Sequence, residues 1–296
     1  MAGIVTNEIT PTIGAVFISE HWAKEAQLAE RKEQVLAATV DTSYEAEMSS
    51  GRIIHIAHVL NQTATAKSDS TIVVPDANTP TNQDITVSRY FYTATYWQSV
   101  TQKQADIVNV EDIAGQFGYA LMGQIETDLA ALPDDATANV IGTFGQEYSM
   151  DDWETIWQTA QTSLWPAGEE RFVWGSSALI SAIRKLGTPI SSDYTKSNQA
   201  ALDKATIGMF LGFKIVESQY LESPATGQHD NGAHRRKGLI LIRQQMPKME
   251  RQRILPDLSD LVVGWELFVT AEREIVTETA GAESLNDSGH MWLKSV

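Results

Sequence analysis

The feature that most constrains the fold is a long segment with helical periodicity in the first half of the chain. Apolar residues recur every three or four positions over residues 110–132, which places them along one face of an α-helix. This stripe consists of Val110, Ile113, Ala114, Phe117, Leu121, Ile125, Leu129 and Leu132. Asn109 is a suitable N-cap, and Pro133 is expected to end the helix. A helix of this length measures about 34 Å, so it can brace a flat subunit as well as a compact one.

The composition is that of a folded protein without covalent or thiolate reinforcement. The chain has 296 residues, of which 43% are hydrophobic and 20% are charged. There is no cysteine, which excludes disulfides and thiolate metal sites. No apolar run reaches the roughly 18 residues that cross a bilayer, and residues 1–8 lack the basic and apolar regions of a secretion signal. We therefore expect synthesis in the cytoplasm and no membrane partner.

The charge balance is strongly acidic. Lys and Arg number 22 against 38 Asp and Glu, a formal net charge of −16. Such a surface repels phosphate on average, which disfavours tight or specific binding to nucleic acid. The acidity can simply keep the protein soluble. Alternatively, an acidic wall can lie close to nucleic acid without binding it tightly.

The segments before the long helix indicate extended arms. Two β-rich stretches, residues 52–59 and 85–100, flank a polar stretch of more than 20 residues, which is too long for a tight hairpin. The second stretch alternates, with Ile85, Val87, Phe91 and Trp97 on one face and Tyr90, Tyr92 and Tyr96 on the other. The pattern predicts a protruding β-arm, which is a liability unless something pairs with it.

The N-terminal region is expected to need a partner surface as well. Residues 1–18 have the composition of an extended arm. Ser19 can cap a helix over residues 20–38, whose apolar stripe is so thin that the helix would be marginal by itself.

Residues 150–245 alternate between helical and strand patterns, which predicts an α/β lobe. Ser149 and Asp152 form a capping-box pattern for a helix through Leu164, and Ser176 can cap a second helix through Leu186. The predicted strands are residues 139–144, 171–174, 213–217 and 239–243, followed by a long apolar strand over 261–276. Residues 222–237 are predicted to be a polar loop, and a polar tail is expected from Thr277.

Candidate metal-ligating residues are few. His55 and His58 are three apart in a predicted strand and should point to opposite faces, so they could not share one ion. His229, Asp230 and His234 share the predicted loop, where solvation explains them better than a metal ion does. We expect no metal and no cofactor.

Catalytic patterns are also lacking. The pairs Asp134–Asp135 and Asp151–Asp152 flank helix ends, where capping and solvation explain them better than acid–base catalysis. The run from Gly115 to Gly118 lies inside the long helix and indicates close packing there rather than a phosphate loop. We predict no catalytic residue and no enzymatic activity.

The order of the parts resembles a known family. An N-terminal arm with Trp22-Ala23-Lys24-Glu25, a long β-arm, an aromatic strand, a long helix ending in Asp128-Leu129-Ala130-Ala131-Leu132 and an α/β lobe follow one another. Within the segment from Ala205 to Ser218, Gly208 is followed by Gly212-Phe213 at the expected start of a strand and then by Ser218. This combination resembles the major capsid proteins of tailed phages with the Hong Kong 97-type fold, over residues 15–276.

The resemblance implies an α+β fold with a defined division of the chain. The implied parts are an N-terminal arm (1–45), an extended loop that lies over a neighbouring subunit (46–98), a peripheral domain with the spine helix 110–132 (99–150), an axial domain (151–255), and a return to the peripheral domain with a C-terminal tail (256–296).

The resemblance also implies a function and partners. The chain is expected to be a non-enzymatic shell protein of the virion, assembled in the host cytoplasm as pentamers and hexamers around double-stranded DNA. Some family members carry an N-terminal scaffolding extension for which this sequence has no counterpart, so a separate scaffolding protein is expected unless assembly proceeds without one. A portal and a possible cement protein are further expected partners. Lys67 lies in the arm, but no acceptor pattern supports a covalent crosslink. The alternatives are a nanocompartment shell of the same fold that encloses an enzyme and, less favoured, an acidic hydrolase.

Six charged residues are predicted to contact neighbouring subunits because they lie in exposed, otherwise unsupported segments. The basic run from His234 to Lys237 reverses the general acidity of the chain, and a subunit contact, a local anion site or a solvated turn can explain it. The predicted contact residues are Arg52, Lys67, Asp76 and Arg89 in the arm and Arg235 and Arg236 in the axial lobe.

Overall fold

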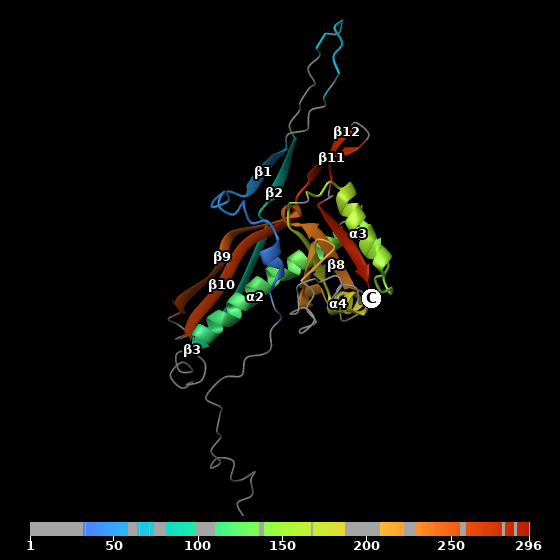
Figure 1. Cartoon of the computed structure of the whole chain (residues 1–296). Helices are drawn as coiled ribbons and strands as arrows, with labels where there is room; N and C mark the ends of the chain where they lie inside the picture. The colour runs from blue at the N-terminus through green and yellow to red at the C-terminus, as the bar shows by residue number, and fades with distance from the viewer. Residues whose placement is uncertain are drawn as a thin grey trace, which may run out of the picture.

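One long helix joins two β-sheets of different size (Figure 1). The helix α2 (Val110–Ala131) lies along a three-stranded sheet, and its C-terminal end reaches a six-stranded sheet. A short 3₁₀ segment, η3 (Leu132–Asp135), follows α2 and contains Pro133, as predicted for the helix end. The computed structural model describes residues 32, 34–58, 64, 66–70, 72–73, 81–98, 110–135, 139–166, 168–186, 208–221, 229–254, 259–279, 282–286 and 289–295.

The three-stranded sheet is antiparallel and packs one face on α2. Its order is β3 (Arg89–Gln98), β10 (Ser259–Glu272) and β9 (Leu239–Ile254). Gly264 of β10 lets the helix approach, because a Cβ atom there would lie 3.2 Å from the ring of Phe117. The prediction of close packing at Gly115 and Gly118 is wrong, since no atom lies within 4 Å of a Cβ atom built at either position.

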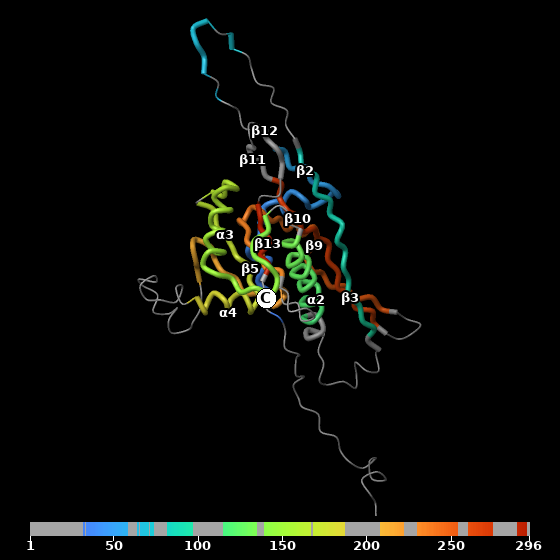
Figure 2. Tube along the Cα trace, turned by 90° about the vertical axis from the view of Figure 1, so that its right-hand side faces the viewer, coloured from blue at the N-terminus to red at the C-terminus, as the bar shows by residue number. Residues whose placement is uncertain are grey.

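A short pair of strands forms the base of the arm. β1 (Ile53–His58) pairs antiparallel with β2 (Thr81–Thr86), which confirms the two strands flanking the polar stretch. The described residues 66–70 lie beyond this pair, away from both large sheets (Figure 2). The second predicted strand is interrupted: β2 ends at Thr86, and β3 begins at Arg89 in another sheet. The chain changes sheet there, at Val87, whose N–H donates to the carbonyl of Arg52.

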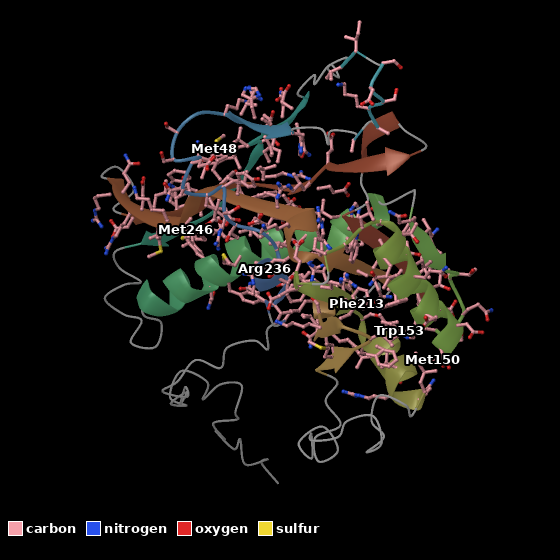
Figure 3. All side chains as sticks on the ribbon, turned by 45° about the horizontal axis from the view of Figure 1, so that its top comes forward. Met48, Met150, Trp153, Phe213, Arg236 and Met246 are labelled. Carbon is pink, nitrogen blue, oxygen red and sulfur yellow. The ribbon has the colours of Figure 1, made fainter. Side chains whose placement is uncertain are left out.

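The six-stranded sheet is covered on both faces. Helices α3 (Met150–Thr162) and α4 (Ser177–Lys185) pack on one face, while the end of α2 and the short η2 (Leu36–Thr39) pack on the other. Figure 3 places Trp153 and Phe213 in this lobe and Met48 and Met246 at the opposite end of the molecule. The strand order is β4 (Val140–Gly142), β13 (His290–Ser295), β8 (His229–Arg235), β5 (Arg171–Gly175), β7 (Phe213–Glu217) and β6 (Met209–Phe210).

The helix caps of the lobe agree with the sequence patterns. Ser149 and Asp152 form the predicted capping box at the start of α3, with each side chain bonded to the other's backbone N–H. The Ser176 hydroxyl accepts from the N–H of Leu179 at the start of α4. Both helices and the strands β5 and β7 confirm the predicted α/β alternation.

Two predictions about polar segments are wrong. Residues 229–235 of the predicted loop form β8, and the predicted tail forms β11 (Ile275–Thr279), β12 (Ala282–Asn286) and β13. The strands β8 and β13 pair on both sides, so sheet hydrogen bonding outweighs their polar composition. Gly232 is needed in β8 because a Cβ atom would lie 2.7 Å from the Pro133 ring.

The predicted helix over residues 20–38 is also wrong where it is described. Lys32, Gln34 and Val35 are not helical, and the helical turn η2 begins only at Leu36. The Glu126 carboxylate of α2 accepts the backbone N–H groups of Val35, Leu36 and Ala37 at 3.2, 2.9 and 3.0 Å. These bonds replace the helical hydrogen bonds that the sequence pattern anticipated. The remainder of that prediction, and the N-cap at Asn109, lie outside the described residues.

Among the described residues, no helix has the length and apolar character that crossing a membrane requires.

Candidate assembly surface

The three-stranded sheet has an open face, which points away from α2. Along β10, alternate residues are buried against α2, and the residues between them are partly exposed. The β3 residues Tyr90, Tyr92 and Tyr96, opposite Leu267, Trp265 and Leu261, are 59%, 68% and 66% exposed. We define the open face as Tyr90, Tyr92, Ala94, Tyr96, Leu261, Val263 and Trp265.

The period of the strand explains how one segment serves two surfaces. Phe91 points towards α2 and stacks on Phe268 with ring centroids 5.8 Å apart. Its neighbour Tyr90 points the other way and meets Trp265 at 5.9 Å. The predicted division of Phe91 and the three tyrosines between opposite faces is therefore confirmed, while the side chain of Trp97 is not among those described.

The composition of the open face is that of an interface. Tyrosine and tryptophan combine a large apolar area with a polar group and are enriched where proteins meet. The adjoining residues of β9 on the same face are Lys248, Glu250 and Gln252, all exposed. Lys248 and Glu250 form an ion pair at 2.9 Å, which holds the pKa of Glu250 below its usual range. An apolar strip beside a polar rim is the anatomy of a protein–protein contact.

The edges of this sheet add unpaired backbone. In the part of the chain that the structure describes, β3 pairs only with β10. On the outer edge of β9, Asp41 forms an isolated bridge with Ile240. From Arg243 to Ile254, no described strand pairs with this edge. Free edges of this length template pairing with another chain. The open face and both edges thus leave apolar area and hydrogen-bonding groups available to a partner.

The arm exposes apolar residues of its own. Ile72 is 90% exposed and Val73 is 71% exposed, which is unusual for aliphatic residues of a folded subunit. Lys67 in the same stretch is also exposed. The base of the arm is anchored, because Ile56, Ile85 and their neighbours pack against the start of β9 and the end of β10. A rigid base with an exposed apolar tip suits a contact with another molecule.

The predicted contact residues of the arm lie at the surface where they are described. Arg52 and Lys67 are exposed. Arg89 is at the start of β3, and its Nε lies 3.2 Å from Oδ2 of Asp128 on α2, so part of its charge is used within the subunit. Asp76 lies outside the described residues. Their roles between subunits stay predictions.

The basic run of the six-stranded lobe is largely neutralised within the chain. Arg235 lies 3.5 Å from Glu169, and Arg236 lies 2.7 Å from Glu170. Lys214 also binds Glu170, and Lys214 and Arg236 together hold the pKa of that carboxyl below its usual range. Arg235 and Arg236 therefore remain predicted contacts with less free charge than the sequence suggested.

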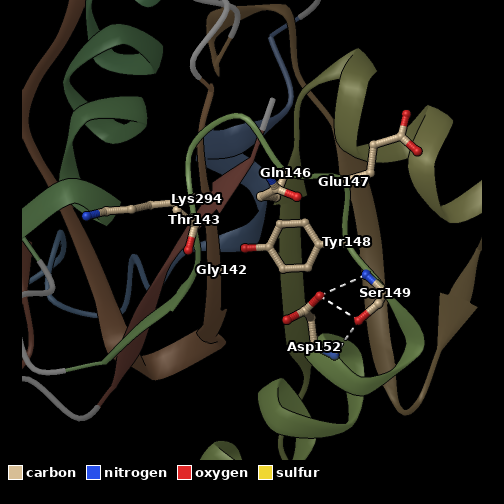
Figure 4. A pocket seen from close by; sticks show the side chains of 8 residues that line it. All are labelled: Gly142, Thr143, Gln146, Glu147, Tyr148, Ser149, Asp152 and Lys294. Carbon is tan, nitrogen blue, oxygen red and sulfur yellow. Dashed lines mark hydrogen bonds between the residues drawn. The ribbon is translucent and has the colours of Figure 1, made fainter.

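A polar cavity of about 340 Å³ lies at the start of α3 (Figure 4). Three of its polar side chains are engaged within the subunit: Asp152 binds Ser149, and the Tyr148 hydroxyl donates to the carbonyl of Ile141 at 2.8 Å. Burial raises the pKa of Tyr148 far above its usual range, so the phenol stays protonated. The lining residues are Gly142, Thr143, Gln146, Glu147, Tyr148, Ser149, Asp152 and Lys294. This arrangement supports capping rather than acid–base catalysis.

The described histidines do not assemble into a metal site. His55 is exposed and His58 is buried, on opposite faces of β1 as predicted. His229, Asp230 and His234 belong to β8 rather than to a loop, and burial lowers the pKa of His234 to about 3. Within the described ranges, no group of three or more His, Asp or Glu side chains is placed to hold a metal ion.

Glu126 and Glu266 are buried carboxylates that sequence reasoning missed. Glu126 holds the segment before η2, and Glu266 of β10 is buried against α2. Glu266 had a visible signal, because it is a single acid in the apolar run from Leu261 to Val269. Glu126 adjoins Ile125 of the apolar stripe, but nothing local indicated which backbone it would meet.

Comparison with known structures connects this geometry to viral shells. A structure from Mycobacterium phage Che8 matches with a TM-score of 0.76 at 20% identity, covering 94% of this chain and 97% of that chain. The capsid structure of Cyanophage P-SCSP1u matches with a TM-score of 0.73 at 17% identity, covering 99% and 97% of the two chains. The mature capsid of bacteriophage PhiM1 matches with a TM-score of 0.71 at 12% identity, covering 94% and 92%. No family model and no curated protein matches the sequence.

These matches confirm, at the level of the fold, the resemblance that the order of parts indicated. The chain has the mixed helix-and-sheet fold of these phage capsid structures over nearly its whole length.

Proposed function

We propose that this chain is the major capsid protein of a tailed phage, a non-enzymatic subunit of the shell that encloses the double-stranded DNA. The observation that carries the proposal is the match to phage capsid structures along 94% to 99% of the chain, with TM-scores above 0.7. Because those structures come from phages, the comparison does not favour a nanocompartment that encloses an enzyme.

The proposal accounts for the surfaces that one copy leaves exposed. The open face of the sheet and the tip of the arm bear apolar groups that a solitary subunit would keep from water. In one copy, the described tip of the arm points away from the open face (Figure 2). In a closed shell these surfaces can be covered by neighbours, since a contact between unlike patches generates rings when the rotation closes.

The finer architecture belongs to the same proposal. We assign the Hong Kong 97-type fold, with α2 as the spine helix, the three-stranded sheet as the core of the peripheral domain and the six-stranded lobe as the axial domain. Pentamers and hexamers would form around the axial domain, with the extended loop lying over the next subunit. The strands β4 and β13 belong to the six-stranded sheet, so segments from 99–150 and 256–296 also contribute to that lobe.

The proposed partners follow from the same assignment. Copies of this chain are the main partner, with a separate scaffolding protein, a portal and a possible cement protein in addition. The net charge of −16 supports weak, non-specific contact with packaged DNA, so that the genome stays free to leave. Assembly would take place in the host cytoplasm before the chain becomes part of the virion.

The test is the state of the purified full-length chain. We expect pentamers, hexamers or closed shells in sedimentation and negative-stain images, either directly or after a scaffolding protein from the same source is co-expressed. Nucleic acid rather than a cargo enzyme should accompany particles isolated from infected cells. A monodisperse monomer under all these conditions, with the open face protected from hydrogen exchange, would contradict the proposal.

A further inference from the structure

Glu266 is a buried carboxyl between α2 and the three-stranded sheet. Its residue is 1% exposed, and it lies on the inner side of β10, opposite Phe91 of β3. Neither carboxylate oxygen has a hydrogen-bond partner among the described residues. Buried carboxylates are normally paired or hydrogen-bonded, because an unpartnered charge in a dry site is costly. An acid kept in this position therefore calls for a role other than packing.

The sheet is irregular at this point. Trp265 lies opposite Lys248 of β9, whereas Leu267 lies opposite Gln245, so the ladder shifts between them and Glu266 has no β9 residue opposite it. The β9 residues left over are Met246 and Pro247, and proline has no N–H to donate. Such a bulge bends a strand and weakens the ladder locally. Glu266 thus lies at an irregularity of the ladder between β9 and β10.

Two charged groups, one on α2 and one on β9, act on the carboxyl, and each has an ion-pair partner of its own. From α2 comes Asp128, paired with Arg89 of β3 at 3.2 Å, and from β9 comes Arg243, paired with Glu45 at 2.6 Å. When Glu266 is ionised, the cluster contains three carboxylates, those of Glu266, Asp128 and Glu45, and the two guanidinium groups of Arg89 and Arg243. When Glu266 is protonated, two carboxylates balance the two guanidinium groups, and the cluster is neutral. The geometry therefore favours the protonated form when α2 and the sheet are packed together.

We propose that Glu266 is a proton-controlled contact beneath α2, which keeps the helix and the bent sheet packed when protonated and loosens them when ionised. Since α2 also packs on the six-stranded lobe, a change at this contact alters how the two regions are held together. Its consequence for a shell, tighter subunits at acidic pH and more deformable ones at alkaline pH, depends on the proposed function.

The electrostatics of the site agree with this assignment. Burial raises the pKa of Glu266 to about 7; the nearby Asp128 acts in the same direction and Arg243 opposes it. The unfolded chain has the ordinary, lower pKa and loses its proton first as the pH rises. The contribution of Glu266 to stability therefore falls between about pH 4.5 and pH 7 and then stays constant.

The test compares two Glu→Gln variants of the full-length chain. E266Q mimics the protonated form, and E250Q makes the same change at an exposed, ion-paired position on the other face of the same sheet. Chemical unfolding is measured on unassembled chains at several values between about pH 5 and pH 8.5. His234, whose pKa is lowered by burial, changes stability in the opposite direction over the same range, so the variants are compared with one another. From about pH 5 to pH 8.5 we expect the folding equilibrium constant of the wild type to fall by up to about a hundredfold relative to that of E266Q, and that of E250Q to keep a constant ratio to the wild type. The same pH dependence in E266Q and the wild type would overturn the proposal.

A second measurement does not depend on how E266Q folds. Infrared difference spectra of wild-type chain with carboxyl-labelled glutamate should contain a neutral carboxyl band near pH 6 that disappears by about pH 8. Absence of that band would overturn the proposal. Because both measurements use unassembled chain, a failure to form shells would contradict the proposed function and leave this result standing.

Discussion

The six-stranded lobe and the three-stranded sheet use the same helix in different ways. The lobe is covered on both faces, by α3 and α4 on one side and by the end of α2 with η2 on the other. The three-stranded sheet has α2 on one face and keeps three tyrosines of the other face more than half exposed. The first region completes its core within one chain, whereas the second leaves one face of its sheet uncovered by the described residues.

This difference predicts that residues of the lobe determine the stability of one subunit, whereas residues of the open face determine association between subunits. Residues of the lobe should affect the stability of each subunit, since the apolar area they bury is already buried in one copy. Residues of the open face should affect association and leave the subunit's own stability almost unchanged, because their burial requires a neighbour. The following predictions test that separation, beginning with the largest effect.

Replacing a lobe tryptophan should cause the largest loss of subunit stability. Trp153 of α3 is fully buried, and W153A should lower the free energy of unfolding by about 3–5 kcal/mol through lost burial and a cavity. Trp157, one turn further along the same helix, is 39% exposed, and W157A should cost much less in the same denaturant experiment. Equal losses in the two variants would show that the lobe does not complete its core within the subunit.

The junction between the two regions depends on Glu126. E126Q puts an NH2 group in place of one of the two oxygens that accept three backbone N–H groups ahead of η2. At least one of these N–H groups then lacks an acceptor, which should cost about 1–2 kcal/mol in the free energy of unfolding. The segment before η2 should also lose protection from hydrogen exchange. The matched change E154Q, on the exposed side of α3, should alter neither measurement, and an equal effect there would contradict the role of Glu126.

The open face should affect association. Y92A should raise the protein concentration needed for assembly by about tenfold, because a central aromatic residue of an interface is lost. Its free energy of unfolding as an isolated subunit should change by less than about 0.5 kcal/mol. W157A removes an exposed aromatic residue from the lobe and should leave the assembly threshold closer to the wild-type value. The comparison fails if W157A shifts this threshold as much as Y92A does.

The capping box should give the smallest effect. S149A removes the hydroxyl that accepts the N–H of Asp152, and it should lower the free energy of unfolding by about 1 kcal/mol. Thermal unfolding monitored by circular dichroism would detect this change. The assembly threshold should stay at the wild-type value, and a large shift in it would place the start of α3 in a contact between subunits.

Much of the fold was predictable because its signals are local. The periodicity of α2, the capping box at Ser149 and the cap at Ser176 each depend on residues within a few positions of one another. The alternation in β3 likewise predicted which tyrosines would share a face. Polar strands gave no such signal: β8 and β13 owe their structure to neighbours on both sides, which lie far away in the sequence.

The amino-acid sequence by itself determined the long helix, the division of β3 into two faces, the α/β order of the lobe and the resemblance to phage shell proteins. Only the tertiary structure decided that residues 290–295 form an interior strand of the sheet and that Glu126 holds a short turn where a helix was predicted. It also decided that Glu266 is buried with no hydrogen-bond partner among the described residues. The physical reason is distance along the chain. Periodicity and caps arise between near neighbours, whereas sheet pairing and the burial of charge depend on segments that meet only after folding.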